Sequence, residues 1–337
     1  MTRDWKIGYN SYRMSPKLLS EESKKPKSNT ALEKFEAKWK ENKFVCVGLD
    51  PEIEKLPEVS INKKDRGEAI FEFNKEIIDA TADLALCYKP NSAFYEGEGI
   101  AGLTALENTI EYIKEKDDSI PIILDAKRGD IGNTNRGYTK FVFDFLGTDA
   151  TTVQPYQGGS ILEAGERSSE ALAPFFERKD KLIFVLCRTS NPSAGELQDL
   201  PISLKSVSRE YIRGFGDIGE IREITGKDVV PLYQIVAFIA VRSWNRNGNL
   251  GLVVGATYPD ELAQVRKIAP DVPILIPGIG PQKGYLEQTI KAGLNSNRQR
   301  IIMNSSRGII YSSNKADFAQ AARAATLKLN DQIKKAI

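Results

Sequence analysis

The chain has 337 residues, of which 41% are hydrophobic, so it is long enough to bury a large core without a disulfide or a metal to hold the fold together. Its 47 Lys and Arg residues almost balance its 45 Asp and Glu residues, and the net charge of +2 gives no electrostatic reason to expect nucleic acid or a membrane surface as a partner. The chain contains no histidine, which excludes Ser-His-Asp and Cys-His nucleophile systems, HExxH zinc sites and His-ligated haem, and leaves proton transfer to Lys, Asp, Glu, Tyr or Cys.

The first 30 residues differ in composition from the rest of the chain. Residues 15–30 are rich in Ser, Lys and Glu, and the whole segment lacks the apolar stretch that a secretory signal requires. We expect residues 1–30 to form a flexible N-terminal extension and residues 31–337 to form one domain. The longest unbroken apolar run, residues 235–241, is far shorter than the ~20 residues of a membrane span.

The cysteines indicate the compartment. Cys46, Cys87 and Cys187 each lie in a short apolar run, and no two of them have CxxC spacing. This pattern is typical of small buried core residues in a reducing environment. Because no secretory signal is present, the sequence predicts a cytoplasmic protein.

Eight short, almost continuously apolar runs follow one another from residue 44, as is typical of buried parallel strands. They are residues 44–50, 84–89, 121–127, 149–155, 181–188, 250–257, 272–278 and 300–306. Segments of helical composition, such as residues 102–116, 160–178 and 259–269, separate them. The pattern predicts a single α/β domain with the (β/α)8 TIM-barrel fold. A doubly wound open sheet is the alternative, and it is weakened because no GxGxxG follows the first strand.

The connection after the fifth predicted strand is long and polar. It runs over residues 193–230 and precedes an apolar helix at residues 231–244. A polar segment of this length inside a compact domain is usually functional or disordered. Because it follows the C-terminal end of a strand, where barrels carry their chemistry, we expect an insertion that forms a lid or part of the rim.

A first cluster of charged residues lies in LDAKRGDIGNT, residues 124–134, at the end of the third predicted strand. Asp125 and Lys127 are two positions apart, so on a strand they point to the same face, which we place at the top of the barrel lumen. Lys89 ends the neighbouring strand, and Asp130 follows in the loop. Two cations and two anions can therefore alternate, each favouring the charged form of its neighbours. These residues alone leave open whether the cluster is catalytic or a structural salt-bridge network.

A second cluster has the composition of a phosphate site. The loop IPGIGPQKG, residues 276–284, follows the seventh strand and offers the backbone N–H groups of Gly278 and Gly280. NSSRG after the eighth strand offers Arg307 and a helix N-terminus. Barrels frequently bind phosphate at these two loops, and a guanidinium can bind two phosphate oxygens. Ordinary turn glycines and a solvated arginine are the alternative.

Taken with their flanks, these motifs resemble the orotidine 5'-monophosphate decarboxylase family, in particular its longer bacterial-type branch. The matching segments are VGLDP (47–51), YKPNSAFYE (88–96), LDAKRGDIGNT (124–134), RTSNPSAG (188–195), GLVVGAT (251–257), IPGIGPQKG (276–284) and NSSRGIIY (304–311). The resemblance implies conversion of orotidine 5'-monophosphate (OMP) to UMP and CO2 in pyrimidine biosynthesis. It also implies that no metal and no organic cofactor is needed, and that a homodimer carries its active sites at the subunit interface.

The resemblance assigns roles in the reaction to the first cluster. Lys127 would protonate C6 of the pyrimidine, and Asp125 would lie beside the departing CO2 group. Lys89 would complete the charged network and reach the ribose. Asp130 and Thr134 would be contributed by the neighbouring subunit.

The resemblance assigns substrate binding to a further set of residues. Asp50 would bind a ribose hydroxyl, Asn91 would make a substrate contact, and Ser190 would contact the pyrimidine amide. Gln282 and Arg307 would hold the phosphate, beside the two loop glycines.

Physical chemistry agrees with this mechanism, because loss of CO2 leaves a carbanion with no adjacent electron sink and preorganised charge must stabilise it. Two other functions remain open. A Mg2+-dependent sugar-phosphate aldolase, such as hexulose-phosphate synthase, uses the same D-x-K-x-x-D skeleton on the same barrel. YKPNSAFYE and Ser190 argue against it, and metal dependence would discriminate. The other is a catalytically silent nucleotide-binding barrel, which would bind product analogues without turnover.

Overall fold

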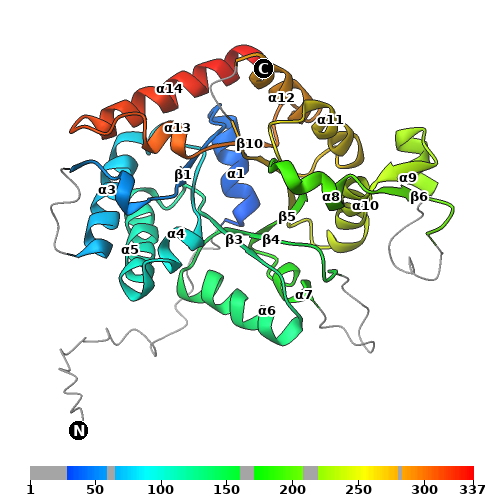
Figure 1. Cartoon of the computed structure of the whole chain (residues 1–337), viewed down its shortest axis with the longest axis horizontal. Helices are drawn as coiled ribbons and strands as arrows, with labels where there is room; N and C mark the ends of the chain where they lie inside the picture. Colours follow the sequence, from blue (N-terminus) through cyan, green and yellow to red (C-terminus); the bar gives the residue numbers. More distant parts are fainter. Residues whose placement is uncertain (1–28, 59–64, 160–170, 208–218, 280–282) are drawn as a thin grey trace, which may run out of the picture.

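The computed structural model describes residues 29–58, 65–159, 171–207, 219–279 and 283–337 (Figure 1). The predicted N-terminal extension, residues 1–30, lies outside the described residues except for its last two. Thr30 caps the first helix, α1 (Ala31–Lys40). Its hydroxyl accepts a hydrogen bond from the Glu33 amide, and the Glu33 carboxylate accepts one from the Thr30 amide. This capping box fixes where the helix begins.

Eight parallel strands form a barrel, as predicted. They are β1 (Val45–Leu49), β2 (Cys87–Pro90), β3 (Ile123–Arg128), β4 (Ala150–Val153), β5 (Leu182–Arg188), β8 (Leu250–Val254), β9 (Ile274–Ile276) and β10 (Ile301–Ser305). Their order is β2-β1-β10-β9-β8-β5-β4-β3, and each neighbouring pair is parallel. Isolated bridges from Tyr88 to Ile122 and from Asn91 to Asp125 join β2 to β3 and close the ring. The doubly wound open sheet is therefore excluded.

Helices follow the strands and cover the outside of the barrel (Figure 1). The longer ones are α3 (Arg66–Thr81), α5 (Gly99–Asp117), α6 (Gly132–Thr139), α10 (Leu232–Ile239), α11 (Pro259–Ile268), α12 (Lys283–Gly293) and α14 (Phe318–Ala336). The short ones are η1 (Ile53–Lys55), α4 (Ser92–Glu96), α7 (Ala173–Phe176) and α13 (Arg307–Ile310), and π-helical turns η2 (Lys140–Phe145) and η4 (Ala240–Trp244) extend α6 and α10. The helices predicted at 102–116 and 259–269 are confirmed, whereas within the described part of 160–178 only α7 is helical. No helix in the described part of the chain is long and apolar enough to cross a membrane.

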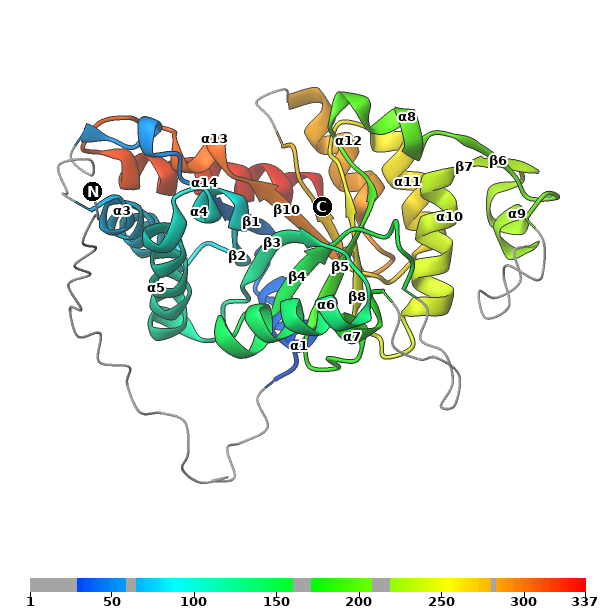
Figure 2. The same cartoon turned by 60° about the horizontal axis from the view of Figure 1, so that its bottom comes forward.

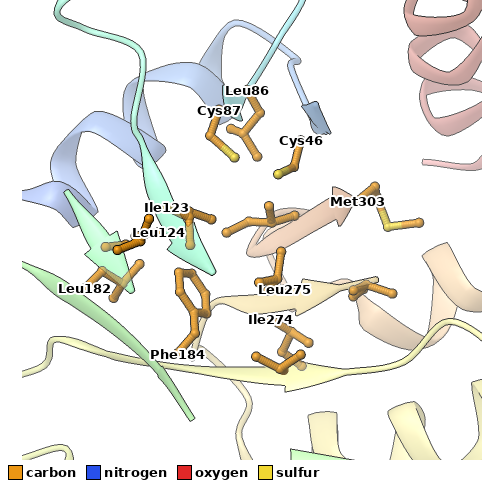
Figure 3. Packing of buried hydrophobic residues seen from close by; sticks show 14 of the residues in the cluster. Cys46, Leu86, Cys87, Ile123, Leu124, Leu182, Phe184, Ile274, Leu275 and Met303 are labelled. Carbon is orange, nitrogen blue, oxygen red and sulfur yellow. The ribbon is translucent and has the colours of Figure 1, made fainter. Parts of the chain in front are cut away.

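The strands are held by apolar side chains that meet at the centre of the molecule (Figure 3). Every residue of β1, β2, β4, β8 and β10 is buried, as is typical of parallel strands that are covered on both faces. Cys46 and Cys87 occupy paired positions on β1 and β2 and appear together in this core. All three cysteines are free and buried, so their prediction as core residues is confirmed.

Helix α1 covers the N-terminal ends of the strands. The indole of Trp39 donates a hydrogen bond to the carbonyl of Ile301, the first residue of β10, over 2.9 Å. The amide of Ala31 donates to the carbonyl of Asp180, just before β5. The opposite end of the barrel, where the strands finish, is the end at which (β/α)8 proteins place their chemistry.

The connection after β5 is an insertion, as predicted. It contains η3 (Pro192–Ala194), α8 (Gly195–Gln198), β6 (Pro201–Ser203), α9 (Gly219–Thr225) and β7 (Val229–Pro231). Strands β6 and β7 pair antiparallel in a small sheet of their own, separate from the barrel. Both views place β6 and α9 beyond α10, at the outer edge of the molecule (Figures 1 and 2). A role as a lid stays a prediction.

Candidate active site

The residues predicted to be functional lie at the C-terminal ends of the barrel strands or in the loops that follow them. Those that the structure describes are Asp50 after β1, Lys89 on β2, Asn91 after β2, Asp125 and Lys127 on β3, Asp130 and Thr134 after β3, Ser190 after β5, Gly278 after β9, and Arg307 after β10. Gly280 and Gln282 lie outside the described residues.

Three charged side chains form a continuous network across β2 and β3. Lys89 Nζ lies 2.8 Å from Asp125 Oδ2, and Lys127 Nζ lies 2.7 Å from Asp125 Oδ1. The bridge between Asn91 and Asp125 brings the ends of the two strands together at this point. One carboxylate thus binds two ammonium groups, one on each oxygen.

Burial differs strongly within this network. The side chains of Lys89 and Asp125 are 3% and 11% exposed, whereas that of Lys127 is 47% exposed. Burial acts to lower the pKa of Lys89, but the charges of Asp125 and Asp50 outweigh it and raise that pKa above its ordinary value. Burial acts to raise the pKa of Asp125, but Lys89 and Lys127 outweigh it and hold that pKa well below its ordinary value. At neutral pH Lys89 and Asp125 are therefore both charged, and Lys127 is the accessible member of the network.

The backbone of β3 is irregular where it carries this network. Lys127 has φ of 46°, in the left-handed region that side chains other than glycine rarely adopt. The pairing of β3 with β4 shifts register between Leu124 and Arg128. A break of this kind re-aims a side chain beside an active site. The hydroxyl of Thr152, on β4, accepts a hydrogen bond from the Lys127 amide over 2.9 Å. The same hydroxyl donates a hydrogen bond to Asp125 Oδ1, also over 2.9 Å.

Asp130 and Thr134 do not join the network of their own chain. Asp130 Oδ1 accepts the amide of Ile131, and within the described residues Asp130 makes no ion pair with either lysine. Asn135 holds the loop in place by donating to the Asp130 carbonyl over 2.6 Å. Thr134 is exposed on α6.

A cavity of about 400 Å3 opens beside the network, at the ends of β1, β9 and β10. It is lined by Asp50, Glu52, Phe94, Gly278, Ile279, Asn304, Ser305, Ser306, Arg307 and Gly308. Asp50 Oδ1 is buried and has no hydrogen-bond partner in the described structure, so an acceptor is free at this point. Gly278 has φ of 90°, a conformation that favours glycine. Helix α13 is only one turn long, so this side of the cavity offers the guanidinium of Arg307 and no helix N-terminus.

Ser190 faces the loop of Gly278, whereas Asn91 caps a short helix. A Cβ atom built on Gly278 would lie 3.4 Å from Ser190 Oγ, so this hydroxyl faces the Gly278 loop. A Cβ atom built on Gly255 would lie 2.7 Å from the Cβ atom of Ser190. The loop that carries Ser190 therefore packs directly on the end of β8. Asn91 caps α4, because its side-chain oxygen accepts the Ala93 amide over 3.2 Å.

A buried arginine, Arg188, supports the loop that carries Ser190 and was not predicted from the sequence. Arg188, at the end of β5, donates to Asp199 Oδ2 over 2.9 Å and to the Thr189 carbonyl over 2.7 Å. Its guanidinium carbon lies 4.5 Å from the centre of the Tyr258 ring. Arg188 therefore ties the insertion and the loop after β8 to the segment that carries Ser190. A charged residue ending an apolar strand was the signal available in the sequence.

A tyrosine that was also missed fixes the loop after β1. The hydroxyl of Tyr311 accepts the Glu52 amide over 2.7 Å and donates to the Asp50 carbonyl over 3.3 Å. Burial raises its pKa to about 12. Tyr311 directly follows α13, which begins with Arg307. Its hydroxyl therefore links the segment that carries Arg307 to the loop that carries Asp50. Its place in NSSRGIIY was the only sequence signal.

The residues described in the structure contain no cluster of metal-ligating side chains. In this part of the chain, no three His, Cys, Asp or Glu side chains gather closely enough to hold a metal ion.

A family model described as orotidine 5'-phosphate decarboxylase / HUMPS family matches residues 43–322. Among curated relatives, the orotidine 5'-phosphate decarboxylase of Thermomicrobium roseum is 45% identical over 293 residues, covering 87% of this chain and 90% of the relative. That of Cellvibrio japonicus is 41% identical over 303 residues, covering 90% and 97%. Among solved structures, OMP decarboxylase of Leishmania donovani has a TM-score of 0.68 and 34% identity, covering 90% of this chain and 99% of that one.

Proposed function

Because the chain belongs to the orotidine 5'-phosphate decarboxylase family, its reaction is the conversion of OMP to UMP and CO2, and we propose that the Lys89–Asp125–Lys127 network performs it. The observation that carries this proposal is a buried carboxylate bound to two lysines at the open end of the barrel, with one lysine accessible. The step belongs to pyrimidine biosynthesis. We propose that no metal and no organic cofactor takes part.

The chemistry follows from where charge develops. The bond between C6 and the carboxylate breaks, CO2 leaves, and the electron pair stays on C6. The Lys127 ammonium stabilises that pair and then transfers a proton to C6, after which solvent reprotonates the amine. Asp125 lies beside the substrate carboxylate, and their repulsion is relieved as neutral CO2 departs. Lys89 keeps Asp125 ionised and oriented.

The cavity beside the network binds the rest of the substrate. Arg307 holds the phosphate together with the backbone of Gly278 and with Gly280 and Gln282. The unpartnered oxygen of Asp50 accepts a ribose hydroxyl. This binding energy, far from the breaking bond, orients the pyrimidine toward Lys127.

The pyrimidine itself is held at the rim of the site. We propose that Ser190 contacts its amide and that Asn91 makes a further contact, as the resemblance implies.

We propose that two copies of the chain form a homodimer in which Asp130 and Thr134 enter the partner's site. The exposure of Thr134 supports this, as do two large apolar side chains on the same segment, Ile131 at 64% and Phe145 at 60% exposed. Mixing inactive Lys127→Ala protein with inactive Asp130→Ala protein tests it. Mixed dimers contain one intact site, so subunit exchange should restore roughly one quarter of wild-type activity. If activity stays absent although mixed dimers form, both residues come from one chain.

The reaction assignment is tested by the ultraviolet absorbance change of OMP with EDTA-treated protein. Turnover unaffected by EDTA supports the cofactor-free decarboxylase. Turnover that requires added Mg2+, or aldol products from a sugar phosphate, would favour the aldolase of the same barrel, and tight UMP binding without turnover would favour the silent binder. The free, buried cysteines support a reducing compartment, and we place the protein in the cytoplasm.

A further inference from the structure

The end of β3 has a backbone geometry that needs support. Leu124 pairs with Thr151 on β4, and Arg128 pairs with Val153, so the three residues between Leu124 and Arg128 lie opposite Thr152 alone. Lys127 adopts its left-handed conformation inside this bulge. A residue other than glycine is strained in this conformation, so its surroundings must favour it.

The hydroxyl of Thr152 fills the gap that the bulge leaves in the ladder. Thr152 is 1% exposed. Its Oγ1 accepts the Lys127 amide over 2.9 Å and lies 2.9 Å from Asp125 Oδ1. Because a backbone amide donates and an ionised carboxylate only accepts, the single hydroxyl proton points to Asp125.

These contacts close a ring through Lys127. Its amide donates to Thr152, Thr152 donates to Asp125 Oδ1, and the same oxygen binds Lys127 Nζ at 2.7 Å. The backbone and the ammonium of one lysine are thus held by one carboxylate–hydroxyl pair. The half-exposed Lys127 side chain has no other hydrogen-bond partner among the described residues, so this ring fixes its direction.

We propose that Thr152 is a positioning residue of the decarboxylation: its hydroxyl sets the Lys127 ammonium and the Asp125 carboxylate in the geometry that the reaction needs. The inference rests on the roles proposed above for Lys127 and Asp125. Thr152 lies behind them, reaches the reaction only through them, and contributes nothing to the phosphate and ribose cavity, whose lining does not include it.

The chain offers a matched control on the adjacent residue. Thr151 is fully buried on the same strand and its hydroxyl also donates over 2.9 Å to β3, but to the backbone carbonyl of Leu124. Thr151→Val therefore removes a hydroxyl at the same depth, between the same two strands, without touching a charged group. It reports the cost of a lost buried hydrogen bond alone.

The experiment compares Thr152→Val, Thr152→Ser and Thr151→Val in single-turnover decarboxylation of OMP and in binding of UMP. We expect Thr152→Val to slow the chemical step about 10- to 100-fold, as misplacing a catalytic group does, with the affinity for UMP within about twofold of wild type. Thr152→Ser should recover most of the rate, and Thr151→Val should keep the rate within about twofold.

The inference is overturned if Thr152→Val slows the chemical step no more than Thr151→Val does, or if Thr152→Ser is as slow as Thr152→Val. Should the valine variant not fold, Thr152→Ala and Thr152→Ser give the same comparison, because they differ only in the hydroxyl. Failure of the inference is distinct from failure of the proposed function, since in the latter case the wild-type protein itself would not decarboxylate OMP.

Discussion

Replacing Lys127 with methionine separates a catalytic network from a structural one. Lys127 is about half exposed, and without it Asp125 still binds Lys89 and Thr152. The free energy of unfolding should therefore change by less than about 1 kcal/mol, as for other exposed ion pairs. The rate of decarboxylation should fall at least ~10²-fold, because the variant lacks the proposed proton donor and the cation proposed to lie beside C6.

Asp125→Asn, unlike Lys127→Met, should lower the free energy of unfolding strongly. It leaves the ammonium of Lys89, whose side chain is 3% exposed, without its carboxylate partner. Breaking a buried ion pair from one side costs about 3–5 kcal/mol, because a desolvated charge is left behind. Adding Lys89→Met removes that charge and should recover most of the lost stability, while both variants remain inactive.

Urea unfolding, at one fixed protein concentration, and OMP turnover measure the two effects on the same samples. Fixed concentration matters because assembly would add to the apparent stability. Lys127→Met protein that is destabilised as much as Asp125→Asn protein, or that keeps more than a few percent of the activity, would contradict a catalytic role for Lys127. The network would then be structural.

Three further predictions address the rest of the site. Arg307→Ala should lower kcat/KM about 10²-fold, equivalent to about 3 kcal/mol, through a higher KM and a slower chemical step; an unchanged kcat/KM would place the phosphate elsewhere. The lowered pKa of Asp125 and the raised pKa of Lys89 put both titrations outside about pH 5–9, so this ion pair should stabilise the protein equally throughout that range. Its contribution should be lost only as the pH falls below about 4 or rises above about 10, and a loss of it within pH 5–9 in urea unfolding would contradict this. Asp199→Asn should raise KM for OMP about tenfold by loosening the Ser190 loop, yet leave inhibition by ribose 5-phosphate unchanged; equal weakening of both would show a wider disturbance.

The barrel could be predicted because buried parallel strands are apolar on both faces. Each strand of the ring therefore appears in the sequence as a short continuous run, and the topology then gathers the strand ends at one edge. The meeting of Lys89, Asp125 and Lys127 follows from that topology and from the spacing of two residues on β3. The register shift and the positive φ of Lys127 do not, because they depend on how β3 pairs with β4.

Supporting contacts were harder to predict than the charged residues they support. Thr152 is one of two adjacent threonines on β4, and only its hydrogen-bond partners distinguish its role from that of Thr151. The pair of Arg188 with Asp199 spans eleven positions and depends on how the insertion folds back on β5. The helix whose N-terminus was predicted in NSSRG, residues 304–308, also proved shorter than a helix-terminus site requires, because α13 ends after one turn.

The most direct test of this account is a crystal structure of the protein with UMP bound. We expect the phosphate on Arg307, a ribose hydroxyl on Asp50, and C6 within hydrogen-bond distance of Lys127 Nζ, with Asp130 of the partner subunit close by. A phosphate bound away from Arg307, or a pyrimidine whose C6 points away from Lys127, would contradict the assignment of the site.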